Sequence, residues 1–280
     1  MILDGVDYRA AFARHRTAPD EALIRRRLAD YAARGVTFLR DGGDRWGVGL
    51  RAKALAGAYG IDYRSPAFNI CRAGHYGAFL GRTFADLAEY RALVAEVKAL
   101  GGDFIKIMAS GLMDFDHYGV LTDTPAEPEL LRDLVAVAHD AGFAVMVHAN
   151  GDAAVSASLA AGAESVEHGA YLHEETLHQL AESGAVWVPT LVTIGNLRHE
   201  GRFPDGVLEP LLAYQQQHVA RAAALGATLA LGTDAGAYTV CHGEAVAQEY
   251  ALLQEALGEK TDEILTAGET AIRRVFRPQA

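Results

Sequence analysis

Residues 127–150 read EPELLRDLVAVAHDAGFAVMVHAN, and this stretch contains the unit from which the chain is built. Its first part has apolar residues at helical spacing and ends at Gly142. Glycine just past a helix end adopts the left-handed backbone conformation at low cost. The apolar run that follows, FAVMV, is short and continuous, as a strand covered on both faces should be. The stretch therefore predicts a helix, a glycine stop and a buried parallel strand.

The same unit recurs along the chain. Helices that end on glycine precede apolar runs at ARG-VTFLR (Gly35), ALGG-DFIKIM (Gly102), DAG-FAVMVH (Gly142), AAG-AESVEH (Gly162), ESG-AVWVPTL (Gly184) and ALG-ATLALGTD (Gly226). Two further candidate strands, MILDGVDY (1–8) and SPAFNIC (65–71), complete the set needed for a (β/α)₈ TIM barrel, which we expect as a single domain over residues 1–280. An open doubly wound sheet shares this alternation, but it usually has a glycine-rich phosphate loop after its first strand, and no GxGxxG follows here.

Composition narrows the classes of partner. The chain has 280 residues, of which 50% are hydrophobic, so it can bury a large core. Its net charge of −11 argues against nucleic acid, because phosphate binding needs a basic surface. No apolar stretch approaches the ~20 residues of a membrane helix, and the start does not resemble a signal peptide. Cys71 and Cys241 cannot form a disulfide framework. We expect a cytoplasmic protein with a small-molecule substrate, no nucleic acid or membrane partner, and a homo-oligomer as one candidate state.

Ionisable side chains end several of the predicted strands. Lys106 lies in FIKIM, His148 ends AVMVH, His168 ends SVEH, and Asp234 ends LALGTD. Taken singly, each residue type is more often a core or turn residue than a functional one. In a barrel, however, the carboxyl ends of the strands meet over one opening. Burying this set without a metal or mutual pairing would cost several kcal/mol, and two imidazoles with carboxylate oxygens suit zinc or another divalent ion.

An ordered series of motifs at these strand ends carries a family resemblance. The series GVTFLRDGG, GHYGAF, DFIKIMASG, AHDAGFAVMVHANGDAAVSASLAAGAESVEHGAYL, VPTL and LGTDAG resembles the amidohydrolase superfamily over roughly residues 30–240. It is most similar to the branch of imidazolonepropionases and prolidase-like dipeptidases. The resemblance implies a metal-dependent hydrolase of a C–N bond in an amide, cyclic amide or dipeptide, or of a related ester or lactone.

The resemblance also implies roles for individual residues. Lys106 matches a lysine that is often carboxylated and bridges two metals, and His148 and His168 match ligands of the second metal. Asp234 matches an aspartate that binds the first metal and transfers the proton, as general base. His75, in AGHYG, matches a histidine expected to face the substrate. We expect one divalent metal, zinc by preference, at Lys106, His148 and His168.

The opening stretch departs from the family pattern. The superfamily has His-x-His at the end of strand one, where this chain has LDGVDY. Strand alternation would place Asp4, Val6 and Tyr8 on one face, with Val6 and Tyr8 in place of the two histidines. The first metal site would then keep Lys106, Asp234 and Asp4 at most. We also expect the barrel without the accessory β-sandwich that usually flanks it.

Three functions remain open at this point. The first is a hydrolase with one metal and Asp234 as base. The second is a degenerate relative that binds a small molecule without hydrolysing it. The third is a metal-free lyase that uses Lys106 as a Schiff base, because desolvation can lower a lysine pKa. We rank the lyase last, because it gives His148, His168 and Asp234 no common purpose.

Loop residues near the expected opening are weaker candidates. Tyr118, beside His117 in FDHYGVL, either contacts substrate or belongs to an exposed loop. Asp41, in RDGG, either orients a ligand or shapes its turn. For Thr190 we expect simple packing beside Pro189.

Overall fold

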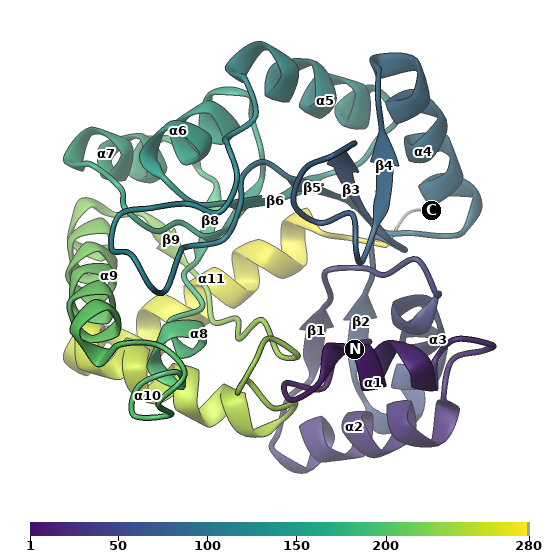
Figure 1. The fold of residues 1–280 in the computed structure, drawn as a ribbon, viewed down its shortest axis with the longest axis horizontal. Coiled ribbons are helices and arrows are strands. Elements are labelled where there is room, and N and C mark those ends of the chain that lie inside the picture. Colours follow the sequence, from purple (N-terminus) through teal and green to yellow (C-terminus); the bar gives the residue numbers. More distant parts are fainter. Residues whose placement is uncertain (279–280) are drawn as a thin grey trace.

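The computed structural model describes residues 1–278, in which short parallel strands are surrounded by helices (Figure 1). The strands are β1 (Phe38–Arg40), β2 (Asp62–Arg64), β3 (Asn69–Arg72), β4 (Arg82–Phe84), β5 (Ile105–Met108), β6 (Val145–Ala149), β7 (Ser165–His168), β8 (Val186–Val188) and β9 (Thr228–Leu229). The helices are α1 (Tyr8–Arg14), α2 (Glu21–Ala33), α3 (Val48–Ala56), α4 (Leu87–Ala99), α5 (Pro128–Asp140), α6 (Asp152–Ala160), α7 (Glu174–Ser183), α8 (Val192–Gly195), α9 (Asp205–Leu225), α10 (Glu244–Leu257) and α11 (Thr261–Val275). Two 3₁₀ turns lie at Gly57–Tyr59 and Gly258–Lys260.

The strand ladders are all parallel. Their order is β4-β3-β5-β6-β7-β8-β9, with β1 and β2 forming a separate pair. Parallel neighbours need long crossover connections, and α5, α6 and α7 supply them between β5 and β8. The predicted alternation of helix and strand is confirmed, and the fold is a TIM-barrel-like α/β arrangement.

Helix α5 illustrates why these segments fold as they do. Proline occupies its first turn, where no hydrogen-bond donor is needed. Leu131, Leu134, Val135 and Ala138 follow at helical spacing and form its buried face. Each fully buried leucine contributes roughly 1.5–3 kcal/mol. Gly142, with φ 87°, then turns the chain toward β6, as the sequence predicted.

The predicted strand at 65–71 is confirmed only at its end, where β3 (Asn69–Arg72) begins, because residues 65–68 form no strand. β2 and β3 are separated by a short irregular segment that begins at Ser65. The Asp103 carboxylate accepts a hydrogen bond from Ser65 N at 2.9 Å, and Asp103 N donates to Ser65 O at 2.7 Å. These bonds hold the break against the start of β5. β4 was not predicted, because RTF offers no apolar run.

The prediction of a strand at residues 1–8 is wrong. The Asp4 carboxylate accepts hydrogen bonds from Val6 N (3.0 Å) and Asp7 N (2.9 Å), which turns the chain, and Asp7 then caps α1. Aspartate side chains compete with strand pairing in this way. Asp4, Val6 and Tyr8 therefore share no strand face, and Val6 is 72% exposed. Within the described residues, β1 and β9 each have one strand partner and do not pair with each other.

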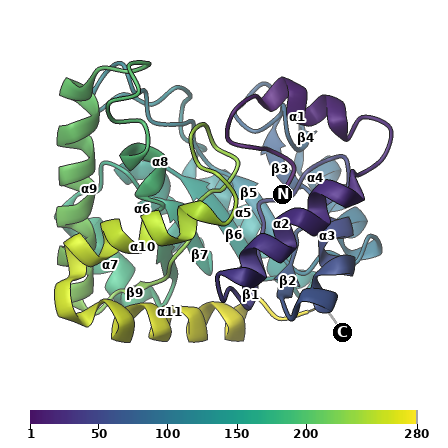
Figure 2. The ribbon, with the colours of Figure 1, turned by 90° about the horizontal axis from the view of Figure 1, so that it is seen from below.

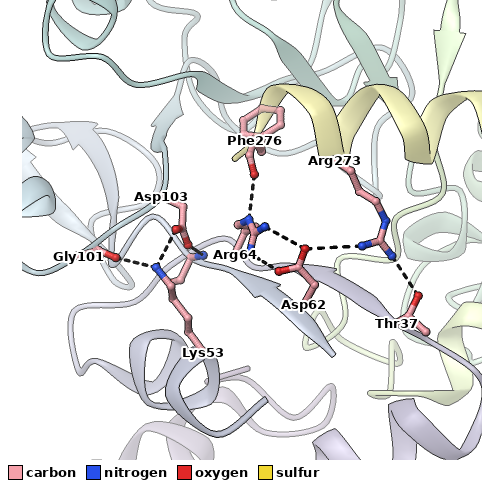
Figure 3. A network of polar contacts seen from close by, with 9 residues as sticks. Thr37, Lys53, Asp62, Arg64, Gly101, Asp103, Arg273 and Phe276 are labelled. Carbon is pink, nitrogen blue, oxygen red and sulfur yellow. Dashed lines mark hydrogen bonds and ion pairs between the residues drawn. The ribbon is translucent and has the colours of Figure 1, made fainter. Parts of the chain in front are cut away.

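Helix α11 connects β9 with the β1–β2 pair across the amino-terminal side of the strands (Figures 1 and 2). Figure 3 shows the polar contacts at its end, where Arg273 donates to Thr37 Oγ1 at 3.0 Å and pairs with Asp62. Arg64 also pairs with Asp62 and donates to Phe276 O at 3.0 Å. Phe276 also belongs to a buried apolar cluster that includes Phe104, so these polar contacts lie next to that cluster. The C-terminal helix thus anchors the first two strands.

A buried ion pair crosses the inside of the barrel from β1 to β7. Arg40 donates to Glu167 Oε1 at 2.9 Å and to Ser165 Oγ at 2.6 Å. The Arg40 and Glu167 side chains are only 6% and 5% exposed. The Arg40 guanidinium also lies 4.3 Å from the centroid of the Phe276 ring. Since no ladder joins β1 to β9, this pair is a principal tie between the β1–β2 pair and the larger sheet.

Replacing Arg40 by methionine should lower the free energy of unfolding by about 3–5 kcal/mol, because Glu167 would stay buried without its partner. Urea denaturation of the purified variant measures this loss. Arg221→Met is the control, since it removes the Arg221–Glu174 pair, in which both side chains are 48% exposed. That change should cost less than about 1 kcal/mol. Equal losses in the two variants would show that the buried pair has no special part in holding the sheets together.

Among residues 1–278, the structure has no helix whose length and apolar character would let it cross a membrane. The 21-residue helix α9 contains Pro210, and its apolar character is interrupted by a run of three glutamines and a histidine at 215–218.

Candidate active site

A cavity of about 1340 Å³ extends from the carboxyl ends of the strands to helix α11, which contributes Leu265, Glu269 and Ile272 to its lining. It exceeds the 300–1,000 Å³ of typical small-molecule sites. Four predicted site residues line it: Lys106 from β5, His148 from β6, His168 from β7, and Asp234 from the segment after β9. The structure therefore brings together the residues that the strand-end pattern singled out.

The two imidazoles are adjacent. Strand register pairs His148 with Glu167 and places His168 beside Ala149. The ring centroids of His148 and His168 lie 4.6 Å apart, edge to face. Burial and the Lys106 charge lower the pKa of His148 to about 3. Burial, His148 and Lys106 lower the pKa of His168 well below its ordinary value. Both rings are therefore neutral near pH 7, the form that ligates metals.

Hydrogen bonds fix one nitrogen of each ring. His148 Nε2 donates to Gly111 O at 3.1 Å, and His168 Nδ1 is 2.7 Å from Thr190 Oγ1. Within residues 1–278, His148 Nδ1 and His168 Nε2 have no hydrogen-bond partner. Metal-binding histidines commonly use one nitrogen for the ion and the other for a carbonyl or hydroxyl. The Gly111 carbonyl can only accept, so it sets a His148 tautomer that matches this pattern. The Thr190 hydroxyl can donate or accept, so its contact is compatible with the matching tautomer of His168 without setting it.

Lys106 and Asp234 complete the polar centre. Burial lowers the pKa of Lys106 to about 8, although the charge of Glu167 opposes this effect. The Asp234 side chain is accessible from the cavity, but loss of hydration among the surrounding protein atoms raises its pKa to about 6. The nearby Lys106 charge opposes that rise. Both groups therefore change protonation near neutral pH, as acid–base residues do.

Left-handed backbone recurs at the ends of the last three strands. His168 has φ 71°, Thr190 has φ 51° and Asp234 has φ 53°. Such angles are uncommon outside glycine and cost of order 1–3 kcal/mol each. In β7, Glu167 points into the barrel toward Arg40, so simple alternation would turn His168 outward. The left-handed turn allows His168 to line the cavity as well.

Three contributors to the site were missed or undervalued in the sequence. Thr190 does not merely pack beside Pro189, because its hydroxyl bonds His168. Glu167 could have been noticed in the sequence only as the neighbour of His168. Its charge partly offsets the lowering of the Lys106 pKa that burial causes. Tyr76 gave no clear signal, yet its ring centroid lies 5.0 Å from that of His148. It reaches the site from a loop whose path sequence periodicity does not describe.

His75 and Tyr118 are not among the residues that line the cavity. His75 Nδ1 lies 3.2 Å from both carboxylate oxygens of Asp123, which also accepts from Tyr76 N at 2.8 Å. In this geometry His75 helps fix the loop that carries Tyr76. Tyr118 is 47% exposed and packs edge-on against Tyr171. Substrate contact by either residue stays a prediction.

The residues present suit a metal ion in part. His148 and His168 offer two neutral nitrogens toward one cavity. Within residues 1–278, however, no three His, Cys, Asp or Glu side chains are arranged to hold a metal ion. A metal ion bound to both histidines would therefore need a third ligand from outside those residue types. Lys106 is close enough for its charge to lower the pKa of both histidines, so it is the natural candidate once converted to a carbamate.

The fold and the site together define an α/β-barrel protein with a polar centre at the carboxyl ends of its strands. The model of the Amidohydrolase family matches residues 55–267, well over half of the chain, and the chain belongs to this family. The resemblance to the amidohydrolase superfamily is thereby confirmed.

Two sequence relatives are similar to large parts of this chain. An uncharacterized protein of Mycobacterium tuberculosis is 29% identical over 228 residues, which cover 77% of this chain and 60% of that protein. The chain thus spans about 60% of the length of this relative. Ochratoxinase of Aspergillus niger is 30% identical over 197 residues, covering 66% of this chain and 38% of the enzyme.

Two solved structures have similar folds. That of A. niger ochratoxinase has a TM-score of 0.79 at 24% identity and covers 100% of this chain and 70% of its own. A Xaa-Pro dipeptidase with bound methionine has a TM-score of 0.71 at 22% identity, covering 88% and 66%. At these identities the structural likeness supports the fold.

Proposed function

We propose that this chain hydrolyses an amide bond, using one divalent metal ion, zinc by preference, held by His148, His168 and Lys106. The observation that carries this proposal is the convergence of two neutral imidazoles, Lys106 and Asp234 on one cavity in a member of the Amidohydrolase family. Amides, cyclic amides and dipeptides all fall within the proposed reaction class.

Lys106 needs a chemical change before it can ligate a cation. An ammonium has no free electron pair, whereas the neutral amine can add to CO₂, forming a carbamate and releasing one proton. Burial favours the neutral amine by lowering the pKa of Lys106 to about 8. Carboxylation would give the site the oxygen ligand that its His, Cys, Asp and Glu residues do not supply together.

Asp234 is proposed as the general base. A bound divalent ion would supply a Lewis acid that acidifies water and polarises the scissile carbonyl. The Asp234 carboxylate would take a proton from the attacking water and return it to the leaving nitrogen as the C–N bond breaks. One amide and one water thus give one carboxylic acid and one amine. The raised pKa of Asp234 suits it both to accept the proton from water and to donate that proton to the leaving nitrogen.

Lys106 also keeps the Schiff-base alternative open, because a buried lysine with a pKa of about 8 is a competent amine nucleophile. In that case Lys106 would form an imine with a carbonyl substrate. Borohydride would then reduce the imine to a stable adduct on Lys106. Amide hydrolysis leaves no such adduct, so mass spectrometry separates the two reactions.

Incubation with zinc and bicarbonate should produce amide hydrolysis in a panel of N-acyl amino acids, dipeptides and cyclic amides, measured as released amine. Chelation should abolish this activity and zinc should restore it. His148→Ala should be inactive under the same conditions. His178→Ala is the matched control, because His178 lies on α7 and pairs with Glu174 at the surface. Hydrolysis that survives chelation, or its absence across the panel, would count against the proposal.

A further inference from the structure

An aromatic surface leads from solvent to the imidazoles. The Tyr76 ring lies 5.0 Å from the His148 ring and 5.8 Å from the Phe79 ring. Phe79 is 42% exposed, and both residues line the cavity. We call these two residues the Tyr76 wall. They offer a continuous path of ring faces and edges from the protein surface to the polar centre.

A second aromatic group lines the same cavity from other loops. Phe115, after β5, lies 5.4 Å from Phe203, after α8. The Arg202 guanidinium lies 4.3 Å from the Tyr238 ring centroid and 5.2 Å from that of Phe203. We call Phe115, Arg202, Phe203 and Tyr238 the Arg202 cluster. Stacking on two rings holds the guanidinium in place while leaving its N–H edge able to bind an anion.

The charge of Arg202 is not neutralised by the protein. No Asp or Glu in residues 1–278 forms an ion pair with it. Among the described arginines that line the cavity, Arg9 and Arg202 have no acidic partner, and Arg202 is the one that lies over two rings. Guanidinium groups bind carboxylates through paired, charge-assisted hydrogen bonds. The cluster is therefore suited to a carboxylate on a ligand.

Exposed aromatic residues need little explanation when they are scattered singly. Here Phe79, which packs against the Tyr76 ring, and Tyr238 (39% exposed), which packs against Arg202, both line one cavity. Aromatic side chains that line a cavity are typical of a small-molecule site. An offset-stacked or edge-to-face aromatic pair adds about 0.5–1.5 kcal/mol to the effect of its buried area.

We propose that the cavity mouth selects amides that carry both an aromatic ring and a carboxylate, the ring packing on the Tyr76 wall and the carboxylate binding Arg202. This inference rests on the proposed function for its reaction, but it concerns binding and can be tested separately. It predicts an order of affinity among small amides that differ by one group.

Three probes test this order in titration calorimetry with the Asp234→Asn protein, in which turnover should be slowed by about 10²- to 10⁴-fold. They are hippurate (N-benzoylglycine), N-benzoylglycinamide, which has no carboxylate, and N-acetylglycine, which has no ring. Hippurate should bind about tenfold more tightly than either of the others, the size expected for losing one charged hydrogen-bonded contact or one aromatic contact. Equal affinity for all three, or no binding of hippurate, would overturn the proposal.

Variants in the same background assign the contacts. Arg202→Gln should weaken hippurate about tenfold but leave N-benzoylglycinamide unchanged, and Arg202→Lys should recover part of the loss. Phe79→Ala should weaken both benzoyl probes and spare N-acetylglycine. Arg16→Gln and Leu100→Ala are matched controls, because both residues are exposed and neither lines the cavity. If Arg202→Gln weakened the two benzoyl probes equally, Arg202 would not be the carboxylate site.

The failure of this inference can be told apart from failure of the proposed function. If the three probes bind in the predicted order but wild type does not hydrolyse any amide, the assignment of the Tyr76 wall and Arg202 as binding groups holds and the proposed hydrolase function fails. If amides are hydrolysed without preference for ring or carboxylate, the reverse is true.

Discussion

Replacing Asp234 by asparagine is expected to lower kcat for amide hydrolysis by about 10²- to 10⁴-fold, with KM nearly unchanged. Asparagine keeps the size of the side chain but cannot accept the proton of the attacking water. The loss should therefore appear in the chemical step and not in substrate binding. Steady-state kinetics with an N-acyl amino acid measures both constants.

The pH dependence of wild type and variant sharpens this test. Loss of hydration among the surrounding protein atoms raises the pKa of Asp234 to about 6, so in wild type kcat/KM should rise with pH through this region as the active carboxylate forms. A bound cation would move the midpoint below 6, because positive charge favours the carboxylate. The residual activity of Asp234→Asn should lack this rise.

Asp41→Asn provides the control for the pH profile. Burial also raises the pKa of Asp41 to about 6, and Asp41 lines the same cavity. Its carboxylate is engaged elsewhere, since Tyr63 Oη donates to it at 3.0 Å and Gly43 N at 3.1 Å. The rise near pH 6 should survive in Asp41→Asn. If it disappeared there and persisted in Asp234→Asn, Asp234 would not be the base.

Local sequence patterns predicted most of the barrel because helix stops and buried strands have strong signals. Gly142 and its counterparts mark helix ends, and continuous apolar runs mark strands covered on both faces. The opening stretch failed because MILDGVDY has a strand-like alternation, whereas Asp4 and Asp7 satisfy backbone donors in a turn and a helix cap. Short strands such as β2 and β4 lack an apolar run and left no comparable signal.

Site residues were predictable where the fold alone places them. Lys106, His148, His168 and Asp234 converge because parallel strands end on one side of a barrel. Thr190 could not be assigned, because its contact with His168 depends on left-handed backbone at both residues. His75 was expected to face the substrate, yet the loop that carries it sets its ring against Asp123. Loop paths are fixed by tertiary contacts that no periodicity encodes.

A second large effect is expected on metal content. Replacing both His148 and His168 by alanine should abolish divalent metal binding, because each ring contributes a neutral nitrogen to the site. His242 also lines the cavity, but both of its ring nitrogens are engaged, with Tyr31 Oη and Leu3 O. His178→Ala should leave metal content unchanged, since His178 is exposed on α7.

The metal site proposed at His148, His168 and Lys106 is tested most directly by elemental analysis. The protein is first incubated with zinc and bicarbonate, and free metal is then removed. We predict about one zinc per chain in wild type and in His178→Ala, and almost none in the double variant. Wild type that retains no metal, or a double variant that retains as much as wild type, would contradict a metal site at His148, His168 and Lys106.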